Sequence, residues 1–243
     1  MNLAVDIGNS AVKAGIFKND KPFRVMRFNH DLYQKILDLV LQYKIENVII
    51  SSVKEYSIPG ATRLKQYLKH YIELSSKTLL PVKNCYQTPE TLGKDRIAAA
   101  IGGISLYPGC NILVIDAGTA LTFDFVNKDQ EYIGGNISPG LSMRYRALHQ
   151  FTNNLPLLQK EEDFELLGEN TNKAIIRGVQ NGIIFEMNNY IESLSVRNGN
   201  LITILTGGDS NFFDNKLKYP IFVEPDLVLI GLNKILKYNL YAH

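Results

Sequence analysis

The stretch DIGNSAVK, residues 6–13, follows a short apolar run and turns the chain back on itself. Gly8 can adopt backbone conformations that are closed to other residues, and it has no side chain to keep a phosphate away. Backbone N–H groups and the Ser10 hydroxyl can then donate to phosphate oxygens, and Asp6 supplies negative charge where a cation would sit. An ordinary hairpin turn explains the stretch equally well when it is taken alone.

A second copy of the pattern favours phosphate binding. VIDAGTA at 114–120 again has an apolar run, Asp-x-Gly and a small polar residue, with Thr119 in the place of Ser10. Two such turns, each opening a similar lobe, predict a nucleotide that is held from both sides of a cleft. The actin-like kinases are built in this way, which makes them a useful analogy.

The other common nucleotide-binding motifs are missing from the chain. There is no GxxxxGK[ST], and no GxGxxG that leads into a helix, so the P-loop and Rossmann classes are excluded. Lys13 lies four residues after Asn9, on the second strand of the expected hairpin. It either reaches phosphate or is a solvated strand lysine, and its spacing alone favours the solvated alternative.

Hydrophobic periodicity predicts the same outline in both halves of the chain. The first half is expected to have strands at 2–7, 11–17, 23–28 and 48–50, and helices at 31–43, 60–70 and 95–107. The second half is expected to have strands at 112–116, 122–126, 132–137 and 201–205, and helices at 140–150, 171–196 and 226–240. We therefore predict an α/β protein with duplicated βββαβα lobes around a nucleotide cleft, at 1–108 and 109–243.

The composition is that of an ordinary globular protein. Of the 243 residues, 45% are hydrophobic and 21% are charged, and the net charge is +2. Lys and Arg are scattered, so nucleic acid is not expected as a partner. With no signal peptide and no run long enough to span a bilayer, we expect no membrane association and a cytoplasmic location. Cys85 and Cys110 fit neither a disulfide framework nor a zinc spacing.

Four stretches together resemble the type III pantothenate kinases. They are DIGNSAVK at 6–13, YQTPETLGKDR at 86–96, DAGTALTFD at 116–124 and GGNISPGLSMRYRAL at 134–148. ENTNKAIIRGVQNG at 169–182 and LTGGD at 205–209 agree more weakly. The Gly-x-Asp-Arg stretch at 93–96 is the discriminating mark, because general actin-like kinases lack it at that point of the chain.

The resemblance covers nearly the whole chain and implies an actin-like (ribonuclease H-like) two-lobe ATPase/kinase fold. It implies a homodimer that transfers the γ-phosphate of ATP to the primary hydroxyl of pantothenate, the first step of coenzyme A synthesis. It also implies Mg²⁺ and a monovalent cation, K⁺ or NH₄⁺, with ATP as co-substrate. Ser10 stands where a threonine is common in the family, which keeps the hydroxyl. Residues 149–156 match only loosely and are given no role.

The resemblance also assigns roles to individual residues. Asp95 is expected to be the general base that accepts the proton of the hydroxyl. ATP binding falls to Asp6, Ile7, Gly8, Asn9, Ser10, Ala11, Val12, Lys13 and Thr119. Pantothenate binding falls to Tyr86, Gly93, Lys94, Asp95, Arg96 and Thr171. Asp6 is expected to bind Mg²⁺, directly or through water, and Asp116 is expected to bind the monovalent cation.

Structural roles compete with several of these assignments. Asp95 and Thr171 could each be the N-cap of the helix that follows. Tyr86 could be a core tyrosine, and Asp116 and Thr119 could simply form a turn. Arg96 could bind the pantothenate carboxylate through two parallel hydrogen bonds, or instead hold Asp95 or a phosphate.

Two pairs of glycines carry further expectations. Gly207-Gly208 could let a nucleotide lie close to the backbone, and Asp209 is expected to be a helix cap. Gly178 and Gly182, four residues apart on the long helix, would allow another helix to approach within the lobe or across a dimer.

Two other functions stay open. One is an actin-like phosphotransferase or phosphatase with a different acceptor, against which the Gly-x-Asp-Arg stretch argues. The other is a non-enzymatic regulatory protein of the same fold. Such a protein is expected to lose acidic site residues, whereas Asp6, Asp95 and Asp116 are all present.

Overall fold

The computed structural model describes residues 1–8, 11–28, 32–52, 61–162 and 165–241. The chain forms two compact units, the first made of residues 1–109, 126–133 and 226–243, and the second of residues 110–125 and 134–225. The predicted lobes, 1–108 and 109–243, follow the repeated motif rather than the packing, and that division stays a prediction.

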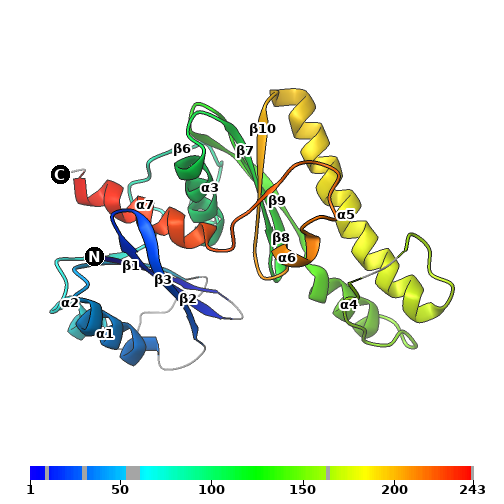
Figure 1. Ribbon diagram of the computed structural model, residues 1–243, viewed down its shortest axis with the longest axis horizontal. Helices are drawn as coiled ribbons and strands as arrows, with labels where there is room; N and C mark the ends of the chain where they lie inside the picture. The colour runs from blue at the N-terminus through cyan, green and yellow to red at the C-terminus, as the bar shows by residue number, and fades with distance from the viewer. Residues whose placement is uncertain (9–10, 29–31, 53–60, 163–164, 242–243) are drawn as a thin grey trace. The chain divides into compact units, whose positions relative to one another are not determined.

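A five-stranded sheet with the order β3-β2-β1-β4-β5 forms the centre of the first unit (Figure 1). Its strands are β1 (Asn2–Ile7), β2 (Val12–Lys18), β3 (Lys21–Phe28), β4 (Asn47–Ser52) and β5 (His70–Glu73). β1 pairs antiparallel with β2 and parallel with β4. The predicted hairpin of β1 and β2 is therefore confirmed, and β1 lies in the middle of the sheet.

Helices cover both faces of this sheet. Helix α1 (Leu32–Tyr43) packs through Ile36 against Leu3 and Val5 in one buried cluster. Helices α3 (Lys94–Leu106) and α7 (Leu227–Tyr241) belong to the other face, where Leu229 of α7 lies against Gly15 of β2. Because side chains alternate along a strand, neighbouring residues of β1 and β2 serve opposite faces.

The predicted helix at 60–70 is wrong in its second half. Helix α2 (Ala61–Lys65) is short, and β5 begins at His70. Residues 70–73 pair in parallel with Asn47–Ile50 of β4, and the N–H groups of Lys69 and His70 both donate to the Glu46 carbonyl oxygen. Hydrogen bonding to the sheet edge outweighs the helical spacing here. Pro59 and Gly60, where the helix was expected to begin, lie outside the described residues.

The second unit is built on strands of the six-stranded sheet with the order β11-β10-β7-β8-β9-β6. These strands are β6 (Lys83–Asn84), β7 (Asn111–Ala117), β8 (Ala120–Val126), β9 (Glu131–Pro139), β10 (Leu201–Thr206) and β11 (Phe222–Val223). β6 pairs with the start of β9, and both of these segments belong to the first unit. The run β3-β2-β1-β4-β5 of the first sheet corresponds to the run β9-β8-β7-β10-β11 of the second. In both runs the first strand along the chain, β1 or β7, lies in the middle, which confirms the predicted duplication.

Three helices complete the second unit: α4 (Leu141–Gln150), α5 (Thr171–Asn198) and α6 (Ser210–Phe213). The residues stepping by four along α5 are buried against the sheet, as the periodicity predicts: Ile175, Val179, Ile183, Met187 and Ile191. The short elements β5, β6, α6 and β11 were not predicted, because each is too short to show a period. No helix in the described part of the chain combines the length and apolarity that a membrane span needs.

Candidate active site

The neighbouring strands β1, β2 and β4 place three polar side chains side by side at one end of the first sheet. The Gly8 N–H donates to the Ala11 carbonyl oxygen at 3.1 Å, which closes the turn. Asp6 is paired with Lys13 across the hairpin and with Ser51 on β4. Paired residues in a sheet share a face, so these side chains are neighbours. Asn9 and Ser10 lie outside the described residues.

The Asp6 carboxylate is in an unfavourable environment for a negative charge. Burial and then the nearby charge of Asp95 raise the pKa of Asp6 to about 6, although the Lys13 charge lowers it. Among the described residues, neither Asp6 Oδ1 nor Ser51 Oγ has a hydrogen-bond partner, and both atoms are buried. A buried oxygen without a partner is costly, and a cation that takes oxygen ligands would relieve that cost. Asp6 therefore fits the Mg²⁺ implied by the resemblance.

Asp95 occupies the first turn of α3, where Gly93 is the N-cap. The alternative that Asp95 is the N-cap is therefore wrong. Its Oδ1 accepts a hydrogen bond from the Arg96 N–H at 2.9 Å. A Cβ atom on Gly93 would lie 2.7 Å from that same oxygen, so a larger residue would displace the carboxylate.

Arg96 and Tyr86 lie close together in the first unit. The Arg96 side chain is buried, and its guanidinium carbon is 5.9 Å from the centre of the Tyr86 ring. The Tyr86 ring also lies 6.1 Å from the ring of Tyr132, which is fully buried, whereas Tyr86 is only partly buried. Tyr132 is thus the core tyrosine of the two, and Tyr86 packs against it at the edge of the core. Arg96, which directly follows Asp95, thus forms a cation–aromatic pair with Tyr86.

Lys13 is held by an acidic residue that was not predicted. Its Nζ lies 4.0 Å from Asp226 Oδ1, and both side chains are mostly buried. The solvated alternative for Lys13 is therefore wrong. Asp226 precedes α7, far away in the sequence, and no local signal links it to Lys13.

Ser51 was also missed, although a signal for it exists. The strand predicted at 48–50 extends to Ser52, and Ser51 is fully buried beside Asp6. Polar residues that bind ligands gather at the carboxyl ends of parallel strands. A strand parallel to β1 must therefore place its last residues next to Asp6.

The second Asp-x-Gly turn forms a tight cradle in the second unit. The Gly118 N–H donates to the Ala120 carbonyl oxygen at 3.1 Å. A Cβ atom would lie 3.0 Å from Asp116 Oδ1 if placed on Gly118, and 2.4 Å from it if placed on Gly207. Gly207 has a φ of 96°, which favours glycine. A carboxylate oxygen enclosed by glycine backbone fits a site for a monovalent cation.

Gly207 has a structural reason to be glycine that was not expected. A Cβ atom there would also lie 2.6 Å from the Ala117 carbonyl oxygen. The close approach of two backbones explains this glycine without a nucleotide, whereas Gly208 has open space around its Cβ position among the described residues. Asp209 stands at the N-cap position of α6, as predicted, but its carboxylate bonds Lys160 Nζ at 2.8 Å and makes no cap hydrogen bond.

Thr119 and Thr171 also belong to the second unit. The Thr119 carbonyl oxygen accepts from the Gly140 N–H at 3.2 Å, which joins the turn to the start of α4, and its side chain is exposed. Thr171 is the first residue of α5, but the cap is Asn170, whose side chain accepts from the Lys173 N–H at 3.0 Å. The N-cap alternative for Thr171 is therefore wrong. Thr171 lines an open, largely apolar groove together with Gly178.

The predicted residues thus form two groups, one in each unit. The first unit contains Ile7, Gly8, Ala11, Val12, Gly93 and Lys94 together with Asp6, Lys13, Tyr86, Asp95 and Arg96. The second contains Asp116, Thr119 and Thr171. Within the described ranges, no three His, Cys, Asp or Glu side chains cluster as ligands of a metal ion. An Mg²⁺ ion at Asp6 would thus take its other ligands from water and phosphate, as Mg²⁺ commonly does.

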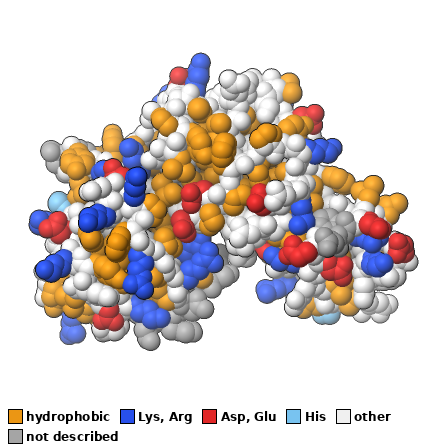
Figure 2. Space-filling model, in the orientation of Figure 1, with side chains coloured by type: hydrophobic (Ala, Val, Ile, Leu, Met, Phe, Trp, Pro, Cys, Tyr) orange, Lys and Arg blue, Asp and Glu red, His pale blue; other side chains and the backbone are white. Residues whose placement is uncertain are grey.

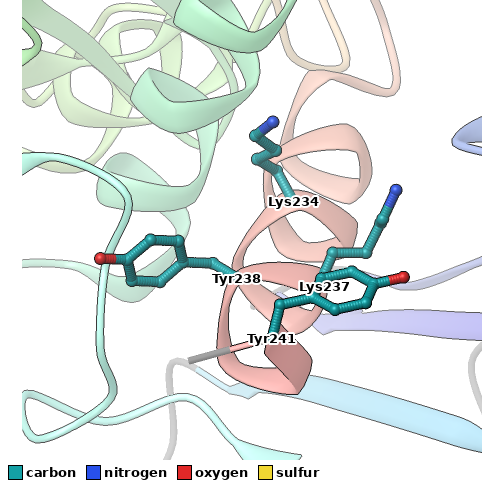
Figure 3. Close-up of a pocket in the computed structure, with 4 residues that line it drawn as sticks. All are labelled: Lys234, Lys237, Tyr238 and Tyr241. Carbon is teal, nitrogen blue, oxygen red and sulfur yellow. The ribbon is translucent and has the colours of Figure 1, made fainter. Parts of the chain in front are cut away.

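The described residues that line a further hollow in the first unit include none of the predicted site residues. Figure 3 shows Lys234, Lys237, Tyr238 and Tyr241 projecting from α7 around a pocket of about 350 Å³. Lys237 forms an ion pair with Asp20. On the face drawn in Figure 2, basic and acidic side chains are interspersed with hydrophobic ones.

Two sheets of the same strand order, each with an Asp-x-Gly turn after its first strand, define an actin-like ATPase/kinase fold. Solved structures of this fold align over the chain. A glucomannokinase of Arthrobacter that uses inorganic polyphosphate or ATP has a TM-score of 0.51 and 13% identity, with 98% of each chain covered. The activator of 2-hydroxyisocaproyl-CoA dehydratase from Clostridium difficile, with bound ADPNP, has a TM-score of 0.53 and 11% identity, covering 98% of this chain and 97% of that one.

The sequence narrows the class to one family. Residues 2–193 match the family model of the type III pantothenate kinases. The type III pantothenate kinase of Phocaeicola vulgatus is 44% identical over 239 residues, which cover 98% of this chain and 99% of the relative. That of Cytophaga hutchinsonii is 42% identical over 241 residues, covering 98% and 100%. The chain belongs to the type III pantothenate kinase family.

A third solved structure shares the fold. A Campylobacter jejuni protein whose name places it in the Baf family of transcriptional activators has a TM-score of 0.63, with 98% of each chain covered. Its identity to this chain is 24%, so the likeness shows the shared fold alone.

Proposed function

We propose that this protein transfers the γ-phosphate of ATP to the primary hydroxyl of pantothenate and so forms 4′-phosphopantothenate, the first step of coenzyme A biosynthesis. Membership of the type III pantothenate kinase family supports the reaction and both substrates. The structural observation that carries the proposal is the pair of interacting carboxylates, Asp6 and Asp95. Asp6 is suited to hold a cation beside phosphate, and Asp95 is suited to accept a proton.

Asp95 is the proposed general base. A primary hydroxyl has a high pKa, so a carboxylate held against it must accept its proton as the new bond to phosphorus forms. The Arg96 N–H fixes the Asp95 carboxylate, and Gly93 leaves the space for it. Phosphoryl transfer depends mainly on positioning and charge neutralisation, and the fixed orientation of the Asp95 carboxylate suits it to accept the proton.

The Asp6 hairpin is proposed to bind the phosphates of ATP. Mg²⁺, when bound, neutralises charge on the phosphate groups. Asp6 would hold it, directly or through water, and Lys13, oriented by Asp226, would contact a phosphate oxygen. The remaining residues of this proposed ATP site are Ile7, Gly8, Asn9, Ser10, Ala11 and Val12, with Thr119 from the second turn.

The other side chains are proposed to orient pantothenate and a monovalent cation. The planar guanidinium of Arg96 suits the pantothenate carboxylate, because it can donate two parallel hydrogen bonds. Tyr86, Gly93, Lys94 and Thr171 complete the proposed pantothenate site. Asp116, enclosed by Gly118 and Gly207, is the proposed ligand of K⁺ or NH₄⁺.

We also propose a homodimer. Several large apolar side chains of the second unit are well exposed, among them Phe151, Leu167, Phe185 and Val196. The Cβ position of Gly178 meets no described atom within 4 Å, so α5 can accept a close neighbour there. Light scattering on the purified protein is expected to give about twice the chain mass of 27.4 kDa. A cytoplasmic location stays a prediction.

The deciding experiment measures ADP release from the purified protein with MgATP, with and without pantothenate, in K⁺ and then in Na⁺. Turnover that requires pantothenate and K⁺ is the expected result. Pantothenate-dependent turnover at the same rate in K⁺ and in Na⁺ would support the proposed kinase reaction but contradict the proposed role of Asp116. Absence of pantothenate-dependent turnover in either salt would reject the proposed reaction in favour of another acceptor or the regulatory alternative.

A further inference from the structure

The segment that leads into α5 lies along the side of that helix and is fastened to it by three helix residues. We call residues 161–162 and 165–169 the strap. Arg177, Gln180 and Asn181 of α5 all donate hydrogen bonds to backbone carbonyl oxygens of the strap. Gln180 and Asn181 follow Arg177 by three and four residues, so the three side chains share one side of the helix.

Gln180 makes the most complete of these connections. It is fully buried, and its Nε2 donates to the Glu161 carbonyl oxygen at 3.0 Å. Its Oε1 accepts from the Glu161 N–H and from the Tyr145 hydroxyl, each at 2.9 Å. A buried amide with its hydrogen bonds made fixes its neighbours, because any rearrangement would leave polar atoms without partners. Gln180 therefore joins the strap and α4 to α5.

Arg177 holds the other end of the strap. Its side chain is 9% exposed, and it donates to the Leu167 carbonyl oxygen. The same guanidinium lies 3.2 Å from Glu165 Oε2 and 3.9 Å from Glu169 Oε1. Both glutamates are well exposed, so the two ion pairs contribute little by themselves. The hydrogen bond to the Leu167 carbonyl oxygen is the part that a lysine could not reproduce with the same geometry.

The strap runs directly into the turn that presents Thr171. Gly168 lies so close to the first turn of α5 that a Cβ atom on it would be 2.2 Å from the Ala174 nitrogen. Asn170 then caps the helix through the Lys173 N–H, and Thr171 is its first residue. The position of the strap thus determines how the capping turn and Thr171 are held.

We propose that Arg177 and Gln180 are positioning residues for pantothenate, which act by holding the strap and, through it, the Asn170–Thr171 turn. The inference rests on the proposed function, in which Thr171 contacts pantothenate. Neither side chain needs to touch the substrate. Their loss should therefore weaken pantothenate binding and leave the chemistry at Asp95 and the binding of ATP unchanged.

The test compares Arg177→Lys with a matched control, Lys173→Met. The control removes an exposed ion pair, Lys173 Nζ to Glu169 Oε2 at 3.0 Å, from the same part of the strap. Arg177→Lys is expected to raise the KM for pantothenate about tenfold, as for the loss of one hydrogen bond to a charged group, with kcat and the KM for ATP nearly unchanged. Lys173→Met should leave all three constants unchanged.

Hydrogen–deuterium exchange gives a second measurement that does not depend on turnover. In Gln180→Leu, the Glu161 amide is expected to exchange faster than in the wild type. In Arg177→Lys, the amides of 165–170 are expected to exchange faster. In both variants, the amides of β7 should exchange as in the wild type. If Arg177→Lys does not fold, Asn181→Ala replaces it. That variant removes bonds of 3.1 Å and 3.3 Å to the Glu165 and Leu166 carbonyl oxygens from a partly exposed side chain.

Three outcomes would overturn the inference. The first is faster exchange of the strap with an unchanged KM for pantothenate. The second is a fall in kcat with both KM values unchanged. The third is a wild-type protein without pantothenate-dependent turnover, which would reject the proposed function as well. The first two outcomes leave the proposed function standing, because the wild type is then active.

Discussion

The carboxylates of Asp6 and Asp95 lie close enough in the first unit for the charge on Asp95 to raise the pKa of Asp6. Asp6 comes from the end of β1 and Asp95 from the first turn of α3. Burial of Asp6 is the larger cause, and together they raise its pKa from 3.8 to about 6. At neutral pH the protein must therefore hold a buried negative charge, which a bound cation would stabilise.

Replacing Asp6 by asparagine should stabilise the protein in the absence of divalent cations. Because the folded-state pKa of Asp6 is raised, the folded protein holds this proton more tightly than the unfolded chain between about pH 4 and 6. Its stability falls as the pH rises through that window, and the loss is complete above it. Urea denaturation should show Asp6→Asn to be more stable by about 1–3 kcal/mol near neutral pH and equal to the wild type near pH 4.

The same two proteins test the cation site. Mg²⁺ should raise the stability of the wild type and have little effect on Asp6→Asn, because ligand binding stabilises only the form that binds it. An Asp6→Asn variant that is less stable than the wild type near neutral pH would contradict the raised pKa. An equal response of both proteins to Mg²⁺ would contradict the role of Asp6 as its ligand.

Replacing Asp95 by asparagine should abolish turnover without unfolding the protein. The amide has nearly the same shape and can still accept the hydrogen bond from Arg96, but it cannot accept the substrate proton. We expect kcat to fall by about 10²- to 10⁴-fold, with ATP binding and the melting temperature nearly unchanged. Asp129→Asn, at an exposed turn between β8 and β9, is the matched control and should behave as the wild type. Normal turnover by Asp95→Asn would show that another group is the base.

The first of the two turns shows how far the sequence could go. An apolar run, Asp-x-Gly and a return strand predict the hairpin, and its second copy predicts the shared strand order of the two sheets. The reason is that glycine and the alternation of apolar residues act locally. The partners of the hairpin are not local. Ser51 reaches Asp6 only because β4 pairs with β1, and Asp226 reaches Lys13 from the other end of the chain.

The second turn shows the same limit. Its Asp-x-Gly pattern is visible in the sequence, but the glycine of the neighbouring turn, Gly207, is required by backbone contact with Ala117. Such a contact depends on how two strands end side by side, as β7 and β10 do here. The strap is another case, because no spacing in the sequence connects Arg177 with the Leu167 carbonyl oxygen. Outside short-range motifs such as helix caps, side chains that bind backbone groups leave no pattern in the sequence.

Replacing Asp116 by asparagine should remove the response to K⁺. Asparagine fits the same space between Gly118 and Gly207, so the turn should stay intact, but the neutral amide binds a cation more weakly than a carboxylate. Turnover of the variant is expected to be low and equal in K⁺ and Na⁺, whereas turnover of the wild type is expected to be higher in K⁺ than in Na⁺. The melting temperature should be close to that of the wild type. A variant that keeps full K⁺ activation would place the monovalent cation elsewhere.

Two glycine-to-alanine substitutions on helices should have opposite effects on stability. A Cβ atom on Gly231 of α7 would lie 1.7 Å from the Ala98 carbonyl oxygen of α3, and backbone cannot move aside as a side chain can. Gly231→Ala should therefore lower the free energy of unfolding by about 2–4 kcal/mol. The Cβ position of Gly178 on α5 has no described atom within 4 Å. Gly178→Ala should therefore raise the free energy of unfolding of the monomer by about 0.5–1 kcal/mol.

Denaturation in urea measures both substitutions, and activity gives a further contrast. Because α3 carries Asp95 in its first turn, any shift of α3 away from α7 in Gly231→Ala should also lower kcat. Gly178 is remote in the chain from that turn, so Gly178→Ala should keep its kcat. If Gly231→Ala were as stable as the wild type, the close contact between α3 and α7 would be wrong.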